Sequence, residues 1–141
     1  MSEIHSRKII IKNTIEEVQR AITDFEAFAA THSIPTNVML KINIVLDELL
    51  SNIVKYSFPD GKEHVIDITL ELFTTGKLTL CLTDEGVPFN PFSAPDPDLS
   101  MPLEQREIGG LGILIVKRLM DEYNYKRQAN LNITSMKKNK I

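Results

Sequence analysis

The chain has 141 residues, of which 43% are hydrophobic and 25% are charged, and its formal net charge is -3. This length fits one domain, expected over residues 1–141, and the small negative charge disfavours direct binding to nucleic acid. The single cysteine, Cys81, excludes an internal disulfide, and there is no signal region and no apolar run long enough to cross a bilayer. We therefore expect a cytoplasmic protein without a membrane-spanning segment.

The first part of the chain predicts a strand followed by two helices. Three consecutive isoleucines within residues 7–13 favour a strand, and either residue of the pair 13–14 can cap the helix that follows. Apolar residues recur at helical spacing over residues 15–29, which predicts an amphipathic helix. Pro35 suits the first turn of a second, longer helix, which is expected to end near residues 56–59.

The middle of the chain predicts a hairpin and then a long loop. Apolar and β-branched residues over 65–72 and 78–82 favour two strands, and Thr75 and Gly76 favour the turn between them. Residues 85–108 contain five of the seven prolines and show no regular apolar period. A loop of this length inside a compact domain is usually functional, so we interpret it as a lid.

The remaining residues predict a third helix after Gly112 and two short strands between residues 123 and 137, with a turn near residues 129–130. Together these elements predict an α/β (α+β) two-layer sandwich, in which three helices cover one face of a mixed β-sheet.

A carboxylate and a carboxamide lie four residues apart on the second predicted helix. Glu48 and Asn52 therefore share one face of that helix and can converge on one ligand. A carboxylate there can accept a proton, and an amide oxygen is a suitable ligand for Mg²⁺. Lys55 lies on nearly the same face and can reach a phosphate oxygen. By itself, this pattern also fits the solvated face of an amphipathic helix.

A second carboxylate follows the second strand of the predicted hairpin. Asp84 is placed where the backbone leaves the sheet, so its side chain can accept a hydrogen bond from the amino group of adenine. Gly86 has no side chain and allows a purine ring to approach the backbone. An ordinary turn that closes a strand explains the same residues equally well.

A glycine-rich segment precedes the third predicted helix and consists of Gly109, Gly110, Leu111 and Gly112. Backbone amides and the positive end of a helix dipole favour a polyphosphate at such a place. The segment lacks the Lys-Ser or Lys-Thr of a Walker loop and the spacing of a dinucleotide fold. Arg106 can add positive charge near the phosphates, although an exposed structural arginine is about as common.

These three segments, in this order, resemble those of the GHKL superfamily, which includes histidine kinase catalytic domains, gyrase-type ATPases and heat-shock chaperone ATPase domains. Residues 48–52 resemble the N box of that superfamily, residues 84–86 its first glycine box and residues 109–112 its second. Residues 97–121 are most similar to the anti-sigma-factor serine/threonine kinases of bacterial partner-switching systems. The resemblance covers nearly the whole chain.

The resemblance implies a Bergerat ATP-binding fold and the cofactors ATP and Mg²⁺. It implies that Glu48 acts as the catalytic base, that Asn52 holds Mg²⁺, and that Asp84 and Gly86 bind adenine. The glycine-rich segment would then follow the phosphates. Thr134, on the last predicted strand, matches a threonine that assists adenine binding in the superfamily.

The function implied by the resemblance is that of a protein serine/threonine kinase and anti-sigma factor. Such a protein binds a sigma factor or an equivalent regulator and phosphorylates an anti-anti-sigma antagonist protein, and a homodimer is expected. The first strand and first helix are candidates for the dimer interface. The alternatives are a non-catalytic module that uses ATP only to set its conformation, and a simple ATPase that activates water at Glu48.

Overall fold

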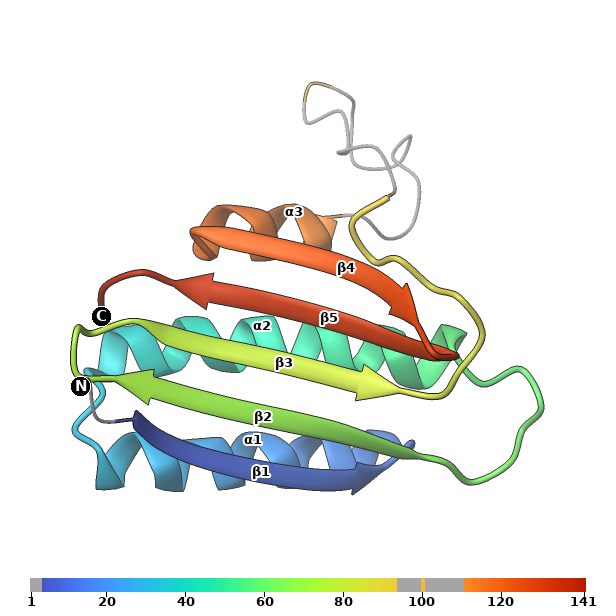
Figure 1. Cartoon of the computed structure of the whole chain (residues 1–141), viewed down its shortest axis with the longest axis horizontal. Helices are drawn as coiled ribbons and strands as arrows, with labels where there is room; N and C mark the ends of the chain where they lie inside the picture. Colours follow the sequence, from blue (N-terminus) through green and yellow to red (C-terminus); the bar gives the residue numbers. More distant parts are fainter. Residues whose placement is uncertain (1–3, 94–99, 101–110) are drawn as a thin grey trace.

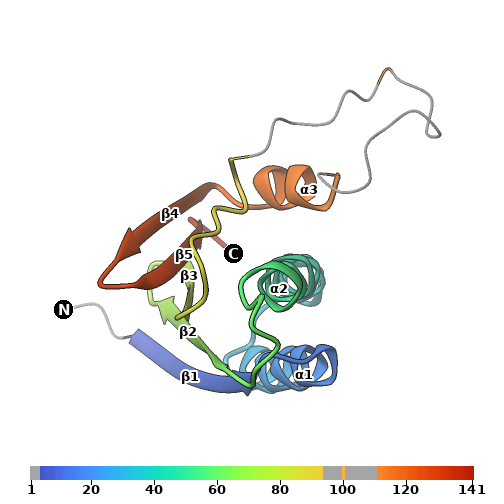
Figure 2. The same ribbon diagram turned by 90° about the vertical axis from the view of Figure 1, so that its right-hand side faces the viewer.

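The computed structural model describes residues 4–93, 100 and 111–141, which build a five-stranded sheet and three helices. In chain order the elements are β1 (Ile4–Lys12), α1 (Ile15–Thr31), α2 (Thr36–Tyr56), β2 (Val65–Phe73), β3 (Leu78–Asp84), α3 (Leu111–Leu119), β4 (Glu122–Gln128) and β5 (Leu131–Lys138). All three helices lie on one face of the sheet (Figure 2). The predicted two-layer α/β sandwich is therefore confirmed.

The strand order in the described part of the chain is β1-β2-β3-β5-β4, and every neighbouring pair is antiparallel (Figure 1). The expectation of a mixed sheet is thus wrong. Strands β3 and β4, which α3 connects in the chain, do run in the same direction. They do not pair, however, because β5 turns back from β4 and lies between them. The two helices between β1 and β2 return the chain to the end where β1 stops, so this pair is antiparallel as well.

Helices α1 and α2 begin where the sequence places their start signals, whereas α3 begins at Leu111 and so includes Gly112, which was expected to precede it. The Thr14 hydroxyl accepts a hydrogen bond from the Glu17 amide at 3.3 Å, and acidic residues occupy the first turn of α1, where they favour the helix dipole. Pro35 comes directly before α2, and its fixed backbone angle suits a helix start. In the residues that the structure describes, no helix is both long and apolar enough to span a membrane.

Residues with positive φ angles form the two hairpin turns. Gly76 has φ 93° between β2 and β3, and Ala129 and Asn130 have φ 52° and 62° between β4 and β5. Two successive left-handed residues are typical of the tight turn whose twist matches that of a β-hairpin. Asparagine enters this region more readily than most residues, which explains how Asn130 serves in place of glycine. Both predicted hairpins are confirmed.

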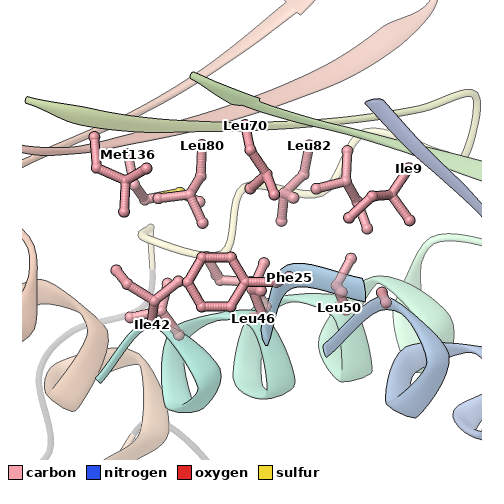
Figure 3. Close-up of a cluster of buried hydrophobic side chains, with 14 of the residues drawn as sticks. Ile9, Phe25, Ile42, Leu46, Leu50, Leu70, Leu80, Leu82 and Met136 are labelled. Atoms are coloured by element: carbon pink, nitrogen blue, oxygen red, sulfur yellow. The ribbon is translucent and has the colours of Figure 1, made fainter. Parts of the chain in front are cut away.

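The core lies between the helices and the inner face of the sheet. Every second side chain of β2 and β3 is buried, which is the alternation expected of a sheet covered on one side. Figure 3 shows Leu70, Leu80 and Met136 of the sheet opposite Phe25 of α1 and Leu46 of α2. All five side chains are inaccessible to solvent. This contact fixes the rotation of α2, and so determines which of its residues face away from the sheet.

Replacing Leu46 by alanine should lower the free energy of unfolding by about 2–5 kcal/mol, because a cavity remains between α2 and the sheet. Leu40 lies on the same helix but is 53% exposed, so Leu40→Ala should change it by less than about 0.5 kcal/mol. Urea unfolding followed by circular dichroism measures both values. Equal losses in the two variants would contradict the packing described for α2.

Candidate functional site

Helix α2 presents Glu48 and Asn52 on a half-buried face, between the buried residues Leu49 and Ile53 and the solvent. The Asn52 Nδ2 donates a hydrogen bond to Glu48 Oε1 at 3.1 Å. This bond uses the amide nitrogen and leaves Asn52 Oδ1 without a partner among the described residues. The predicted pair is therefore brought together, with one carboxylate and one amide oxygen available to a ligand.

The start of α3 lies directly against Glu48. Gly112 is in the first turn of this helix, and a Cβ added there would overlap all three atoms of the Glu48 carboxylate. Two of the three predicted segments therefore meet in space, although more than 60 residues separate them in the sequence. The first turn of α3 has no acidic residue, so the positive end of its dipole is available to the Glu48 carboxylate or to another anion.

Asp84 ends β3 on the inner face of the sheet and is only 3% exposed. Its Oδ1 accepts hydrogen bonds from the Gly86 amide at 2.8 Å and from Asn132 Nδ2 at 3.0 Å. Burial raises the pKa of the Asp84 carboxyl, whereas these two bonds and the positive charge of Arg127 act to lower it. The other oxygen, Oδ2, accepts no hydrogen bond from the described residues and keeps its capacity for a ligand.

Gly86 is packed against the C-terminal end of α2. A Cβ at this position would collide with the carbonyl oxygen and Cβ of Ser57, the residue that follows α2. The Val87 amide donates to that same carbonyl oxygen at 2.8 Å. The requirement for glycine here is thus close contact between two backbone segments, and α2 is in contact with both glycine segments.

Three residues that sequence reasoning missed surround Asp84. Asn132 of β5 is 1% exposed and lies directly opposite Asp84 in the β3–β5 ladder. Tyr125 of β4 donates its hydroxyl to Asn132 Oδ1, and Arg127 of β4 donates to the Gly86 carbonyl oxygen at 2.6 Å. One signal for Asn132 was available, because alternation in β5 places it on the same face as Thr134.

The remaining predicted residues differ in burial and in position. Thr134 is 2% exposed and lies opposite Leu82 in the β3–β5 ladder. It is therefore on the same inner face as Asp84, two residues along β5 from the position opposite Asp84. Lys55 is exposed in the last turn of α2, and Leu111 is the exposed first residue of α3. Three predicted residues lie outside the described part of the chain: Arg106, Gly109 and Gly110.

The donor set fits a magnesium nucleotide better than a metal held by protein alone. Among the described residues, no group of three or more His, Cys, Asp or Glu side chains is placed to hold a metal ion. Mg²⁺ usually takes one or two protein oxygens and keeps water and phosphate oxygens as its other ligands, so Asn52 Oδ1 is a sufficient protein ligand. The unused Oδ2 of the buried Asp84 fits the amino group of adenine.

Comparison with known protein families agrees with this geometry. Residues 11–138 match the family described as the histidine kinase-like ATPase domain. The chain belongs to this family. The expected membership of the GHKL superfamily is thereby confirmed, and the matched residues of this ATPase domain include every site residue named above.

Individual relatives support the same assignment. The serine/threonine-protein kinase BtrW from Bordetella bronchiseptica is 30% identical over 91 residues, which are 64% of this chain and 63% of BtrW. This chain therefore matches less than two thirds of the length of that relative.

Solved structures match at the level of the fold. The RsbU and RsbW domains of Rv1364c from Mycobacterium tuberculosis align with 95% of this chain and 32% of that one, with a TM-score of 0.64 and 14% identity. The histidine kinase domain of the blue-light activated histidine kinase from Erythrobacter litoralis EL346 covers 89% of this chain and 60% of that one, with a TM-score of 0.55 and 16% identity. The α/β fold of the ATPase domain is thus shared.

The two described glycines of the site should respond differently to alanine. Gly86→Ala should lower the free energy of unfolding by about 1–3 kcal/mol, because the new methyl group meets the rigid backbone of Ser57. In Gly112→Ala the new methyl group meets only the flexible end of the Glu48 side chain. Alanine also favours a helix over glycine by about 1 kcal/mol, so the free energy of unfolding of this variant should not fall. Urea denaturation compares the variants, and a larger loss for Gly112→Ala would contradict the contacts described.

Proposed function

We propose that this chain is an ATP-dependent protein serine/threonine kinase and anti-sigma regulatory factor. It binds a sigma factor or an equivalent regulator and phosphorylates an anti-anti-sigma antagonist protein. The proposal depends most on one observation, the placement of Glu48 against the first turn of α3 with Asn52 hydrogen-bonded to its carboxylate. The kinase name of the relative BtrW supports the choice of a protein hydroxyl, rather than water, as the acceptor.

In this proposal Glu48 is the catalytic base. It takes the proton of the acceptor hydroxyl as that oxygen bonds to the γ-phosphorus of ATP and the bond to the leaving ADP oxygen breaks in line, while positioning and charge neutralisation supply most of the rate. The hydrogen bond from Asn52 orients the Glu48 carboxylate and leaves the Asn52 amide oxygen as the group that would hold Mg²⁺. Mg²⁺, when bound there, would neutralise charge on the phosphate oxygens.

The nucleotide is held from both ends in the same proposal. At the adenine end, Asp84 accepts the amino group, Gly86 orients the Asp84 carboxylate through its backbone amide, and Thr134 assists from the same inner face. At the phosphate end, backbone amides and positive side chains act together. The residues assigned to this end are Lys55, Arg106, Gly109, Gly110, Leu111 and Gly112.

The partners and the organisation of the chain form part of the same proposal. Residues 1–141 act as one kinase domain, and residues 85–108 act as the lid over the nucleotide. A homodimer is expected to use β1 and α1. Strand β1 is an edge strand of the sheet with the exposed residues Ile4 and Ile10, which suits it to an interface.

Replacing Glu48 by glutamine should reduce phosphoryl transfer by about 10²-fold or more, because a general base contributes about 10²–10⁴-fold to a rate. ATP affinity should stay nearly unchanged, since a glutamine oxygen still accepts the hydrogen bond from Asn52. Transfer is measured with γ-labelled ATP and candidate antagonist proteins, and affinity by calorimetry.

Asp47→Asn is the matched control, because Asp47 precedes Glu48 on α2 and is exposed. It should transfer phosphate at the rate of the unmodified protein. Full transfer by Glu48→Gln would remove this residue from the mechanism. Phosphate release without any labelled antagonist would favour a simple ATPase, and ATP binding without either reaction would favour a non-catalytic module.

Replacing Asp84 by asparagine should weaken ATP binding by about 10–100-fold, because a charge-assisted hydrogen bond worth about 1.5–3 kcal/mol is lost. Purine riboside triphosphate has the same phosphates but no amino group, so its affinity should change little. Calorimetry with both nucleotides gives their affinity ratio. Asp67→Asn, on the opposite face of the neighbouring strand, is the matched control.

The same affinity ratio should depend on pH. Burial raises the pKa of the Asp84 carboxyl, so its protonation in acid begins at a higher pH than for an exposed aspartate. Protonation replaces an acceptor by a donor, and the preference for ATP should therefore decline as the pH falls through this raised value. Asp84→Asn should show no such decline, and an unchanged ratio down to the ordinary aspartate range would contradict the assignment.

A further inference from the structure

The side chain of Asn132 uses its full hydrogen-bonding capacity at the adenine end of the site. Its Nδ2 donates to Asp84 Oδ1 at 3.0 Å and to the Val87 carbonyl oxygen at 2.8 Å. Its Oδ1 accepts from the Phe89 amide at 3.2 Å and from the Tyr125 hydroxyl. An asparagine amide offers two donors and two acceptor positions, and here all four are occupied within a nearly inaccessible place.

This arrangement determines which oxygen of Asp84 remains free. Asn132 Nδ2 and the Gly86 amide both donate to Oδ1, so neither occupies Oδ2. The carboxylate is thereby held in one orientation, with a single unused oxygen. An amide turned by 180° would place its oxygen beside Asp84 Oδ1, where two acceptors would repel each other.

Two donors prevent that rotation of the Asn132 amide, and they come from different parts of the chain. Tyr125 projects from the neighbouring strand β4, and its hydroxyl donates to the same oxygen as the Phe89 amide. Phe89 and Val87 belong to the segment that leads away from Gly86 into the expected lid. Asn132 therefore connects the carboxylate with the first residues of that segment.

We propose that Asn132 is a positioning residue that presents Asp84 Oδ2 to the amino group of the purine and joins this carboxylate to the segment Gly86–Phe89, with Tyr125 fixing the orientation of the Asn132 amide. The proposal rests on the proposed binding of adenine by Asp84. It makes the selection of a 6-aminopurine a property of polar groups from β3, β4, β5 and the segment after Gly86, rather than of Asp84 alone.

The test compares the affinities of the full chain for ATP and for purine riboside triphosphate by calorimetry. Asn132→Ala should lower the ratio of the two affinities by about tenfold, since Asp84 loses its orientation and one hydrogen bond. Affinity for purine riboside triphosphate should fall much less. If Asn132 had a merely structural role, the substitution would lower the affinity for both nucleotides equally and leave their ratio unchanged. That result would overturn the proposal.

Tyr125→Phe provides a second variant in case Asn132→Ala does not fold. It keeps the Asn132 contact to Asp84 but removes one of the two donors that orient the amide, and the ratio should fall by about two- to fivefold. The control is Asn124→Ala, because Asn124 is an exposed residue of β4 opposite Ser135. It should leave the ratio as it is.

The variants of Asp84 separate this inference from the proposed function. If the unmodified chain does not prefer ATP, or if Asp84→Asn keeps that preference, then the adenine assignment itself fails. If Asp84→Asn abolishes the preference while Asn132→Ala and Tyr125→Phe both retain it in full, then only the role of Asn132 is refuted.

Discussion

The packing of α2 against the sheet is the constraint on which the candidate site depends. The apolar side of this helix is buried in the core, which leaves Glu48 and Asn52 on a half-buried face near the start of α3. At its C-terminal end, the Ser57 carbonyl holds the Val87 amide next to Gly86. Helix α2 thus sets the spacing between Glu48 and Gly86. The burial of its apolar side chains therefore determines where the polar groups of the candidate site lie.

A buried carboxylate is costly, and the surroundings of Asp84 show how that cost is limited. Removal from water disfavours its charged form, and two hydrogen bonds and the guanidinium of Arg127 oppose the effect. Both hydrogen bonds end on the same oxygen. The second oxygen is left for a ligand, which can supply the missing donor. Partial satisfaction of a buried group is what a binding site requires, and it would be a defect in an ordinary core.

Local patterns in the sequence were sufficient to predict the helices and strands and to identify the three segments that contribute to the candidate site. Helical spacing placed Glu48 and Asn52 on one face, and the end of an apolar run placed Asp84 where β3 leaves the sheet. The mixed sheet was predicted wrongly, because the insertion of β5 between β3 and β4 depends on long-range pairing. Asn132 was missed for a similar reason, since Asp84 and Tyr125 reach it through the register of three strands and Val87 and Phe89 through the path of the segment after Gly86.

Strand β4 connects these points, because it is an edge strand with almost no buried side chains. Its contribution near the site is polar: Tyr125 donates to Asn132, and Arg127 donates to the Gly86 carbonyl oxygen. A shift of one residue in its pairing with β5 would turn both side chains to the outer face. The two contacts therefore favour the native pairing of β4 with β5. That pairing also places Tyr125 and Arg127 next to Asn132 and Gly86, which both bond to Asp84. For this strand, correct pairing with β5 and the ordered surroundings of Asp84 therefore depend on the same register.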